Sequence, residues 1–102
     1  MTQAQRAQKI IGWLVSETGI PEFDLKSQKT PYIAYIRFFA IYLVRENTIL
    51  KTEQIADIFQ RDLRSVYRAL EKIKHIINST PNGNIEREIR RLKKLYDQQN
   101  ET

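Results

Sequence analysis

Basic and hydroxyl side chains recur at helical spacing in one short stretch of the chain. Arg64, Arg68 and Lys72 are four residues apart, with Ser65 beside the first arginine and Tyr67 on the flank. Because residues three or four apart share one helix face, these side chains are expected on a common surface. An arginine can bind guanine O6 and N7 or a phosphate, and a serine hydroxyl can donate to a base or a phosphate. The stretch therefore predicts a DNA-contacting face, although charged side chains also cover many helix faces that meet only water.

The helix that would carry this face is marked by its apolar residues. Their spacing of three and four residues predicts a helix over 63–77 whose apolar side is turned to the core. These residues are Leu63, Val66, Leu70, Ile73 and Ile77. Asp62 is expected to cap the first turn, since a carboxylate accepts free amide hydrogens and suits the positive end of the helix dipole.

A shorter helix is predicted just before this one. Thr52 is expected to cap a helix over 53–59, and the three residues 60–62 then separate the two helices. A short helix, a turn and a second amphipathic helix form the helix-turn-helix pattern. In that motif the N-terminal residues of the second helix meet base edges in the major groove. Arg61 stands in the turn, where a phosphate contact is expected.

Further helices are predicted around this motif. They cover residues 2–17, 31–47 and 84–98. The segment 31–47 is apolar nearly all round, which predicts a buried central helix. Phe23 and Leu25 are expected to fill the core from the preceding connector, and Pro81-Asn82-Gly83 is a strong turn signal. Since no segment has the period of a strand, the chain is predicted to be all-α. We expect five to six helices around the central one, in a single domain spanning 1–102.

Composition excludes several classes of function. The chain has 102 residues and no cysteine, and His75 alone cannot build a metal site. With no convergent carboxylate pair and no phosphate-binding loop, neither an enzyme nor a cofactor is expected. Lys and Arg number 17 against 12 Asp and Glu, giving a net charge of +5 and a pI near 9.6, typical of a nucleic-acid-binding domain. No stretch has membrane length and no signal peptide is visible, so we expect a cytoplasmic, nucleoid-associated protein.

Three segments together resemble a known family. Residues 40–48 resemble its Ala/Leu-rich segment ending in Arg/Lys-Glu-x-Thr, and residues 52–59 resemble its x-x-x-Ile-Gly-x-x-Phe. Residues 61–66 resemble its signature Gly-Gly-Arg-Asp-His-Ser/Thr-Thr-Val. Over about residues 8–96 the chain resembles the C-terminal DNA-binding domain (domain IV) of the bacterial replication initiator DnaA, a Trp-repressor-like helix-turn-helix. The resemblance implies sequence-specific binding of double-stranded DNA, in replication initiation or in transcriptional or mobile-element regulation.

The departures from the family pattern fall on the DNA-contacting positions. Gln60 stands alone where the family has two glycines, Leu63 replaces the signature histidine, and Arg64 replaces a hydroxyl residue. The resemblance also aligns Lys29 with a loop arginine that reaches the minor groove, and Arg37 with an arginine that touches phosphate. An arginine in place of a hydroxyl predicts a guanine contact and a different preferred site.

Two further questions stay open from the sequence. With the signature histidine gone and the basic loop thinned, the chain also suits a protein-interaction module that modulates a replication or transcription complex and binds DNA only weakly. The glycines at 12, 19 and 83 lie too far apart for the phosphate-binding loop of the initiator's ATPase module. We therefore expect a stand-alone regulator, an accessory replication factor or a mobile-element protein, or else an excised domain of a larger protein.

Overall fold

Helices account for all the regular structure in the residues that the computed structural model describes, which are 1–27, 29–80 and 82–100. In chain order they are α1 (Gln3–Thr18), α2 (Glu22–Ser27), α3 (Pro31–Asn47), α4 (Thr52–Phe59), α5 (Leu63–Asn78) and α6 (Asn84–Gln99). The all-α class is confirmed, and the predicted helices begin and end within one residue of the observed ones.

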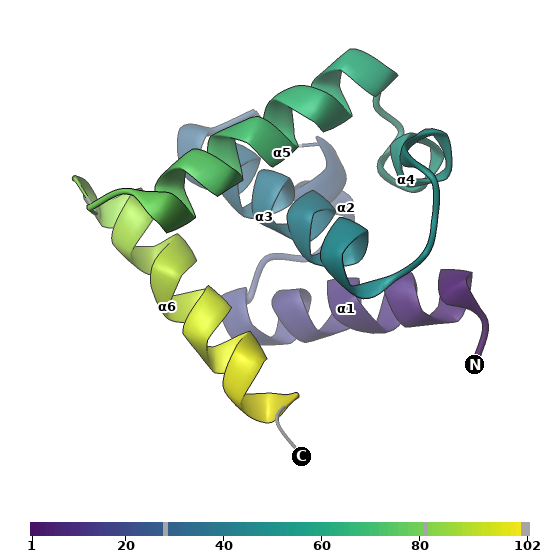
Figure 1. Cartoon of the computed structure of the whole chain (residues 1–102), viewed down its shortest axis with the longest axis horizontal. Coiled ribbons are helices and arrows are strands. Elements are labelled where there is room, and N and C mark those ends of the chain that lie inside the picture. The colour runs from purple at the N-terminus through teal and green to yellow at the C-terminus, as the bar shows by residue number, and fades with distance from the viewer. Residues whose placement is uncertain (28, 81, 101–102) are drawn as a thin grey trace.

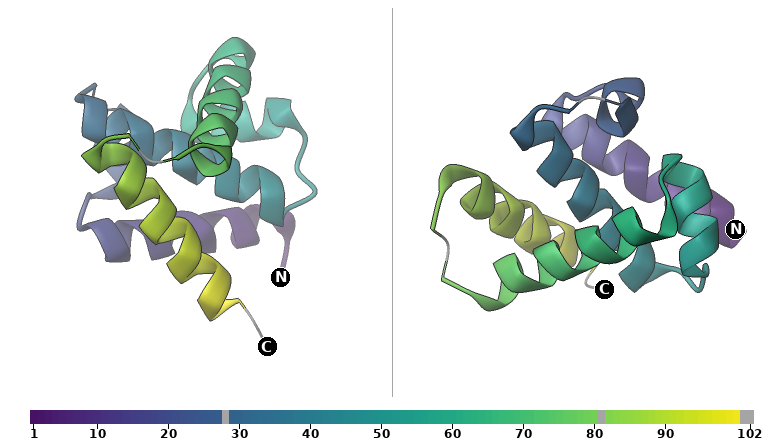
Figure 2. Two further views of the ribbon diagram at one scale, coloured as in Figure 1. Left: turned by 60° about the vertical axis from the view of Figure 1, so that its left-hand side comes forward. Right: turned by 90° about the horizontal axis from the view of Figure 1, so that it is seen from above.

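The central position belongs to α3. It lies between α1 and α5 (Figures 1 and 2) and also packs against α2, α4 and α6. Its buried apolar residues are Ile36, Phe39, Ala40, Ile41, Tyr42, Leu43 and Val44. The expected buried central helix is therefore confirmed. Pro31 opens the helix, where its missing amide hydrogen costs nothing, but the hydroxyl of Thr30 makes no capping hydrogen bond.

Local signals set the ends of α1. The Thr2 amide donates to Gln5 Oε1 at 2.8 Å, and the Gln5 amide donates to Thr2 Oγ1 at 3.0 Å. This reciprocal pair satisfies two amide groups that the first turn would otherwise leave open. The helix ends at Gly19, whose φ of 72° lies in the left-handed region that glycine adopts without strain.

The connector between α1 and α3 corrects one expectation. Of the two residues predicted to fill the core, Leu25 is fully buried but Phe23 is 78% exposed. The segment folds as the short helix α2, and residues two apart on a helix point to nearly opposite sides. Only one of the two side chains can therefore face the core.

The α4–α5 region corrects two further expectations. Lys51, and not Thr52, occupies the N-cap position of α4, and the Lys51 amide donates to Gln54 Oε1 at 2.8 Å. The buried stripe of α5 consists of Val66, Ala69, Leu70, Ile73 and Ile76. Leu63 is 37% exposed and Ile77 is only half-buried. Ala69 and Ile76, which the predicted stripe lacks, are buried, so the buried face is centred further round the helix than predicted and Leu63 lies at its edge. The predicted turn before α6 includes Pro81, which lies outside the described residues.

Candidate nucleic-acid interface

The turn between α4 and α5 is closed by its own backbone. The Arg61 amide donates to Ala56 O at 3.0 Å, and the Gln60 amide donates to Asp57 O at 3.2 Å. Gln60 has φ 54° and ψ 44°, in the left-handed region that favours glycine. The two helices pack against each other across this turn, so α4, the turn and α5 have the geometry of a helix-turn-helix.

The start of α5 is fixed by Asp62. Its Oδ1 accepts the Ser65 amide hydrogen at 2.7 Å, which confirms the predicted N-cap. This hydrogen bond is the main reason that the pKa of Asp62 lies below its usual value, and the nearby positive charges of Arg64 and Arg68 lower it further. The carboxylate therefore orders the first turn, on which the candidate contact residues stand.

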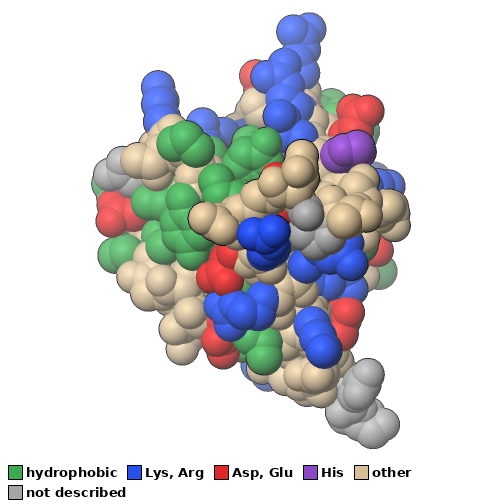
Figure 3. All heavy atoms as spheres, turned by 90° about the vertical axis from the view of Figure 1, so that its left-hand side faces the viewer, with side chains coloured by type: hydrophobic (Ala, Val, Ile, Leu, Met, Phe, Trp, Pro, Cys, Tyr) green, Lys and Arg blue, Asp and Glu red, His purple; other side chains and the backbone are tan. Residues whose placement is uncertain are grey.

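The outward face of α5 carries exposed basic side chains. On a helix of about 3.6 residues per turn, Arg64 lies opposite the buried stripe. Arg64, Arg68 and Lys72 are exposed. Within the described part of the chain, neither Arg64 nor Arg68 makes a hydrogen bond or an ion pair. Lys72 lies with its Nζ 5.8 Å from the centre of the Tyr35 ring, a cation–π arrangement at the edge of the face. In Figure 3, Lys and Arg side chains project from the top of the molecule, on the side where α5 lies in Figure 1.

A small notch opens between α3 and the first turns of α5. It has a volume of about 190 Å³. Its polar lining is Arg37, Arg61, Ser65 and Arg68, and its apolar lining is Phe38 and Ile41. We call these four polar side chains the arginine notch. Three arginines from three separate elements, with a hydroxyl beside them and no acidic residue in the lining, form a site suited to an anion.

Two of these arginines also have a structural role. Arg37 is only 6% exposed and donates to Leu25 O at 3.2 Å, and Arg61 donates to Lys26 O at 2.7 Å. Both guanidinium groups thereby hold carbonyl oxygens near the end of α2. Burial lowers the pKa of Arg37, and the neighbouring charge of Arg61 lowers it further. The Arg61 Nε is buried and has no hydrogen-bond partner in the described residues. The resemblance implies a phosphate contact for Arg37, and the structure places this residue largely in the interior, at the border of the notch.

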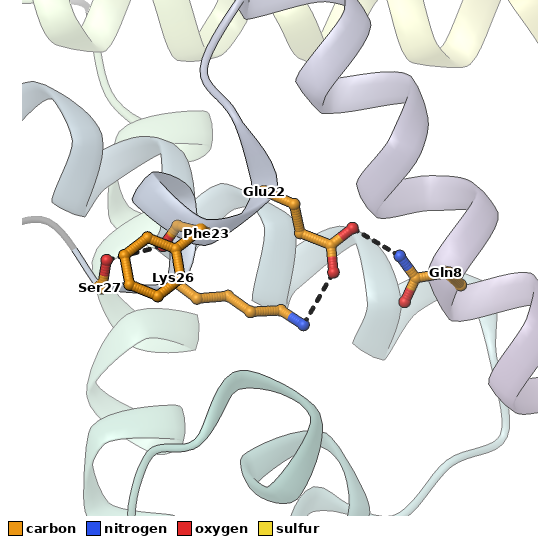
Figure 4. Close-up of polar contacts among 5 residues, drawn as sticks. All are labelled: Gln8, Glu22, Phe23, Lys26 and Ser27. Atoms are coloured by element: carbon orange, nitrogen blue, oxygen red, sulfur yellow. Dashed lines mark hydrogen bonds and ion pairs between the residues drawn. The ribbon is translucent and has the colours of Figure 1, made fainter.

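Helix α2 is in turn connected to α1 through Glu22, the first residue of α2. The Glu22 carboxylate accepts from Gln8 Nε2 at 2.7 Å and from Lys26 Nζ at 3.0 Å, while Ser27 Oγ donates to Phe23 O at 2.7 Å (Figure 4). The Lys26 side chain is thus bound to Glu22 while its carbonyl oxygen accepts from Arg61. These contacts fix the position of the Arg61 guanidinium group in the arginine notch.

The remaining candidates lie at the borders of this surface. Lys29 is exposed and precedes α3. Tyr67 is 54% exposed, and its hydroxyl lies 3.3 Å from Thr52 Oγ1. The sequence did not reveal that Arg37 and Arg61 border one site. One signal was available: Arg37 is the single charge inside the otherwise apolar stretch 31–44.

Fold and site together define an all-helical domain with a helix-turn-helix and a basic face on its second helix. No protein-family model matches this chain, and no solved structure matches it at a significant level. In the described ranges, no helix has the length and apolar character needed to cross a membrane. Among those same residues, no three His, Cys, Asp or Glu side chains gather closely enough to hold a metal ion.

Proposed function

We propose that the chain binds double-stranded DNA sequence-specifically, with the N-terminal half of α5 in the major groove. The observation that carries this proposal is the exposure of Arg64 and Arg68 on the first two turns of α5, without an internal partner. An exposed arginine at this place in a helix-turn-helix is suited to bidentate contact with guanine. Arg64, which points most directly outward, is assigned the base contact.

The arginine notch is assigned a backbone phosphate. Burial is the main reason that the pKa of Arg37 is lowered, and the charge of Arg61 lowers it further; a phosphate would relieve this repulsion between the two arginines. The same anion would also accept from the Ser65 hydroxyl, which lines the notch. Phosphate contacts of this kind fix the register of a protein on the duplex without reading sequence.

Three further residues are assigned to the edges of the DNA. Lys29, Tyr67 and Lys72 are exposed beside the central arginines, where they would meet phosphates or sugars. The resemblance to DnaA domain IV supports a role in replication initiation or in transcriptional or mobile-element regulation. The same DNA box is not expected, because Leu63 and Arg64 replace the family's base-contacting residues.

In-vitro selection from random duplex DNA at near-physiological salt tests this function. We expect a motif to be enriched by the wild-type chain and lost by Arg64→Ala. Binding without any motif, with steep salt dependence alone, would refute sequence-specific recognition, since that dependence comes from phosphates only.

A second candidate is a protein-interaction module with weak, nonspecific DNA binding. The observation that favours it is Phe23, a large apolar side chain that is 78% exposed on α2. Exposed aromatic side chains of this size are frequent anchors in protein interfaces. If the selection yields no motif, Phe23→Ser is the first variant to compare with the wild type for loss of a protein partner.

A further inference from the structure

One apolar side chain lies where the basic surface is expected to meet the DNA bases. Leu63 is the first residue of α5 and is 37% exposed, instead of lying in the core stripe. Tyr67 lies one helical turn further along the same side and is 54% exposed. These two residues, which we call the apolar strip, border Arg64 on the α4 side.

The charge around the strip limits what can cover it. Arg61, Arg64 and Arg68 lie at this end of α5 together with the capping carboxylate of Asp62, which leaves the local charge positive, and Arg64 and Arg68 make no hydrogen bond or ion pair in the described residues. An occupant therefore has to be negatively charged overall and yet present a small apolar group. In duplex DNA the thymine 5-methyl is the one apolar group that an unmodified base displays in the major groove.

We infer that Leu63 reads the 5-methyl group of a thymine in the DNA target. This inference rests on the proposed DNA-binding function, because the N-terminal residues of α5 must reach base edges. Leu63 supplies the apolar contact, and the Tyr67 ring covers its outer side. The Tyr67 hydroxyl, 3.3 Å from Thr52 Oγ1, connects that ring to α4.

Deoxyuridine substitution tests the inference, because it removes the methyl group and keeps the base pairing. Each thymine of the selected duplex is replaced in turn, and affinity is measured for the wild type, Leu63→Ala and Ile49→Ala. Ile49 is the matched control, since it is 85% exposed but lies in the loop between α3 and α4. We expect one thymine whose replacement weakens wild-type and Ile49→Ala binding by roughly fourfold, the value of one buried methyl. Leu63→Ala should bind the two duplexes equally.

The outcomes separate this inference from the proposed function. If selection yields no motif, both fail. If a motif is found but contains no thymine, or if deoxyuridine is tolerated at every position, only the thymine contact fails. Discrimination that Leu63→Ala retains in full also overturns the assignment. As Leu63 is exposed and alanine favours helices, this variant is expected to fold; thermal unfolding checks that it does.

Discussion

Helices α5 and α6 have the same length and similar numbers of cations but use them differently. Each has 16 residues. In α6 most of the cations make internal contacts: Arg91 pairs with Glu88 at 2.7 Å, and Lys93 pairs with Asp97 at 2.5 Å. Arg90 donates to Ser79 O at 2.6 Å, near the end of α5. On the first two turns of α5, by contrast, the arginines reach into solvent.

The number of cations on a helix is therefore a poor indication of a binding surface. A better indication is whether each cation is already paired with a group of the same chain. A paired cation has its field largely cancelled by the adjacent carboxylate, but an unpaired one is available to a phosphate or a base. In Figure 3 basic and acidic side chains lie next to one another lower down, and at the top basic side chains project furthest, with acidic side chains beside them.

The largest expected effect is on DNA affinity. Arg64→Ala should cost about 1–3 kcal/mol of binding free energy, the usual value of a bidentate base contact. Arg91→Ala removes the same charge from α6 and should change affinity by less than about 0.5 kcal/mol. Fluorescence anisotropy with the selected duplex measures both. Equal losses for the two variants would mean that net charge alone governs binding.

For the free energy of unfolding we expect the opposite order, with a larger effect from an arginine of α6 than from one of α5. Arg90→Ala removes hydrogen bonds to Ile77 O at 3.0 Å and Ser79 O at 2.6 Å. Because the site is exposed, we expect a loss of about 1 kcal/mol in the free energy of unfolding, below the usual range for charged hydrogen bonds. Arg68→Ala should lower that free energy by less, since Arg68 makes no hydrogen bond or ion pair in the described residues and acts only through its charge near Asp62. Urea denaturation of both variants checks this. A larger loss for Arg68→Ala would mean that α5 also depends on its outward cations for folding.

The helices were predictable because their signals are local. Apolar spacing, Pro31, Gly19 and the Asp62 cap fixed the elements from residues a few positions apart. The errors arose where local patterns were extended too far. The core stripe of α5 was continued to Leu63, although the buried face is centred on the side of Ala69 and Ile73 and leaves Leu63 at its edge.

The candidate site was predicted only in part. The outward arginines follow from helical periodicity and were found, although their contact with DNA stays a prediction. The meeting of Arg37 with Arg61 was not found, because residues 24 positions apart are brought together by the packing of α3 against the turn. The hydrogen bonds from these two arginines to the carbonyl oxygens of Leu25 and Lys26 also join distant parts of the sequence, so they could not be predicted from local patterns.

A smaller effect concerns the start of α5, which has a charged cap. Asp62→Ala should lower the melting temperature at neutral pH, because the Ser65 amide loses its acceptor. The pKa of Asp62 is lowered in the folded protein, so its contribution to stability is complete above the unfolded value of about 3.9. That contribution is lost as the pH falls through the lower folded pKa. Thermal unfolding from pH 7 to pH 2 should therefore show the gap between wild type and Asp62→Ala closing in acid. Asp62→Asn keeps a cap that does not titrate, so the difference in melting temperature between Asp62→Asn and Asp62→Ala should stay constant with pH. If that difference also disappeared in acid, this account would be refuted.

The smallest expected effect is at the start of α6, where no side chain caps the helix. Gly83 occupies the N-cap position with extended backbone, and Glu86 Oε2 accepts the Asn82 amide hydrogen at 3.2 Å. Gly83→Ser would supply a hydroxyl that accepts the Glu86 amide hydrogen at the N-cap. A Cβ at this position would lie 3.1 Å from Glu86 Oε1, the end of a flexible side chain that can shift. We expect Gly83→Ser to raise the free energy of unfolding by a few tenths of a kcal/mol. Gly83→Ala adds the Cβ without the hydroxyl, so in urea denaturation it should be less stable than Gly83→Ser by about 1 kcal/mol. If the two variants are equally stable, a side-chain cap contributes nothing at the start of α6. Helices α5 and α6 would then differ only in how their cations are paired.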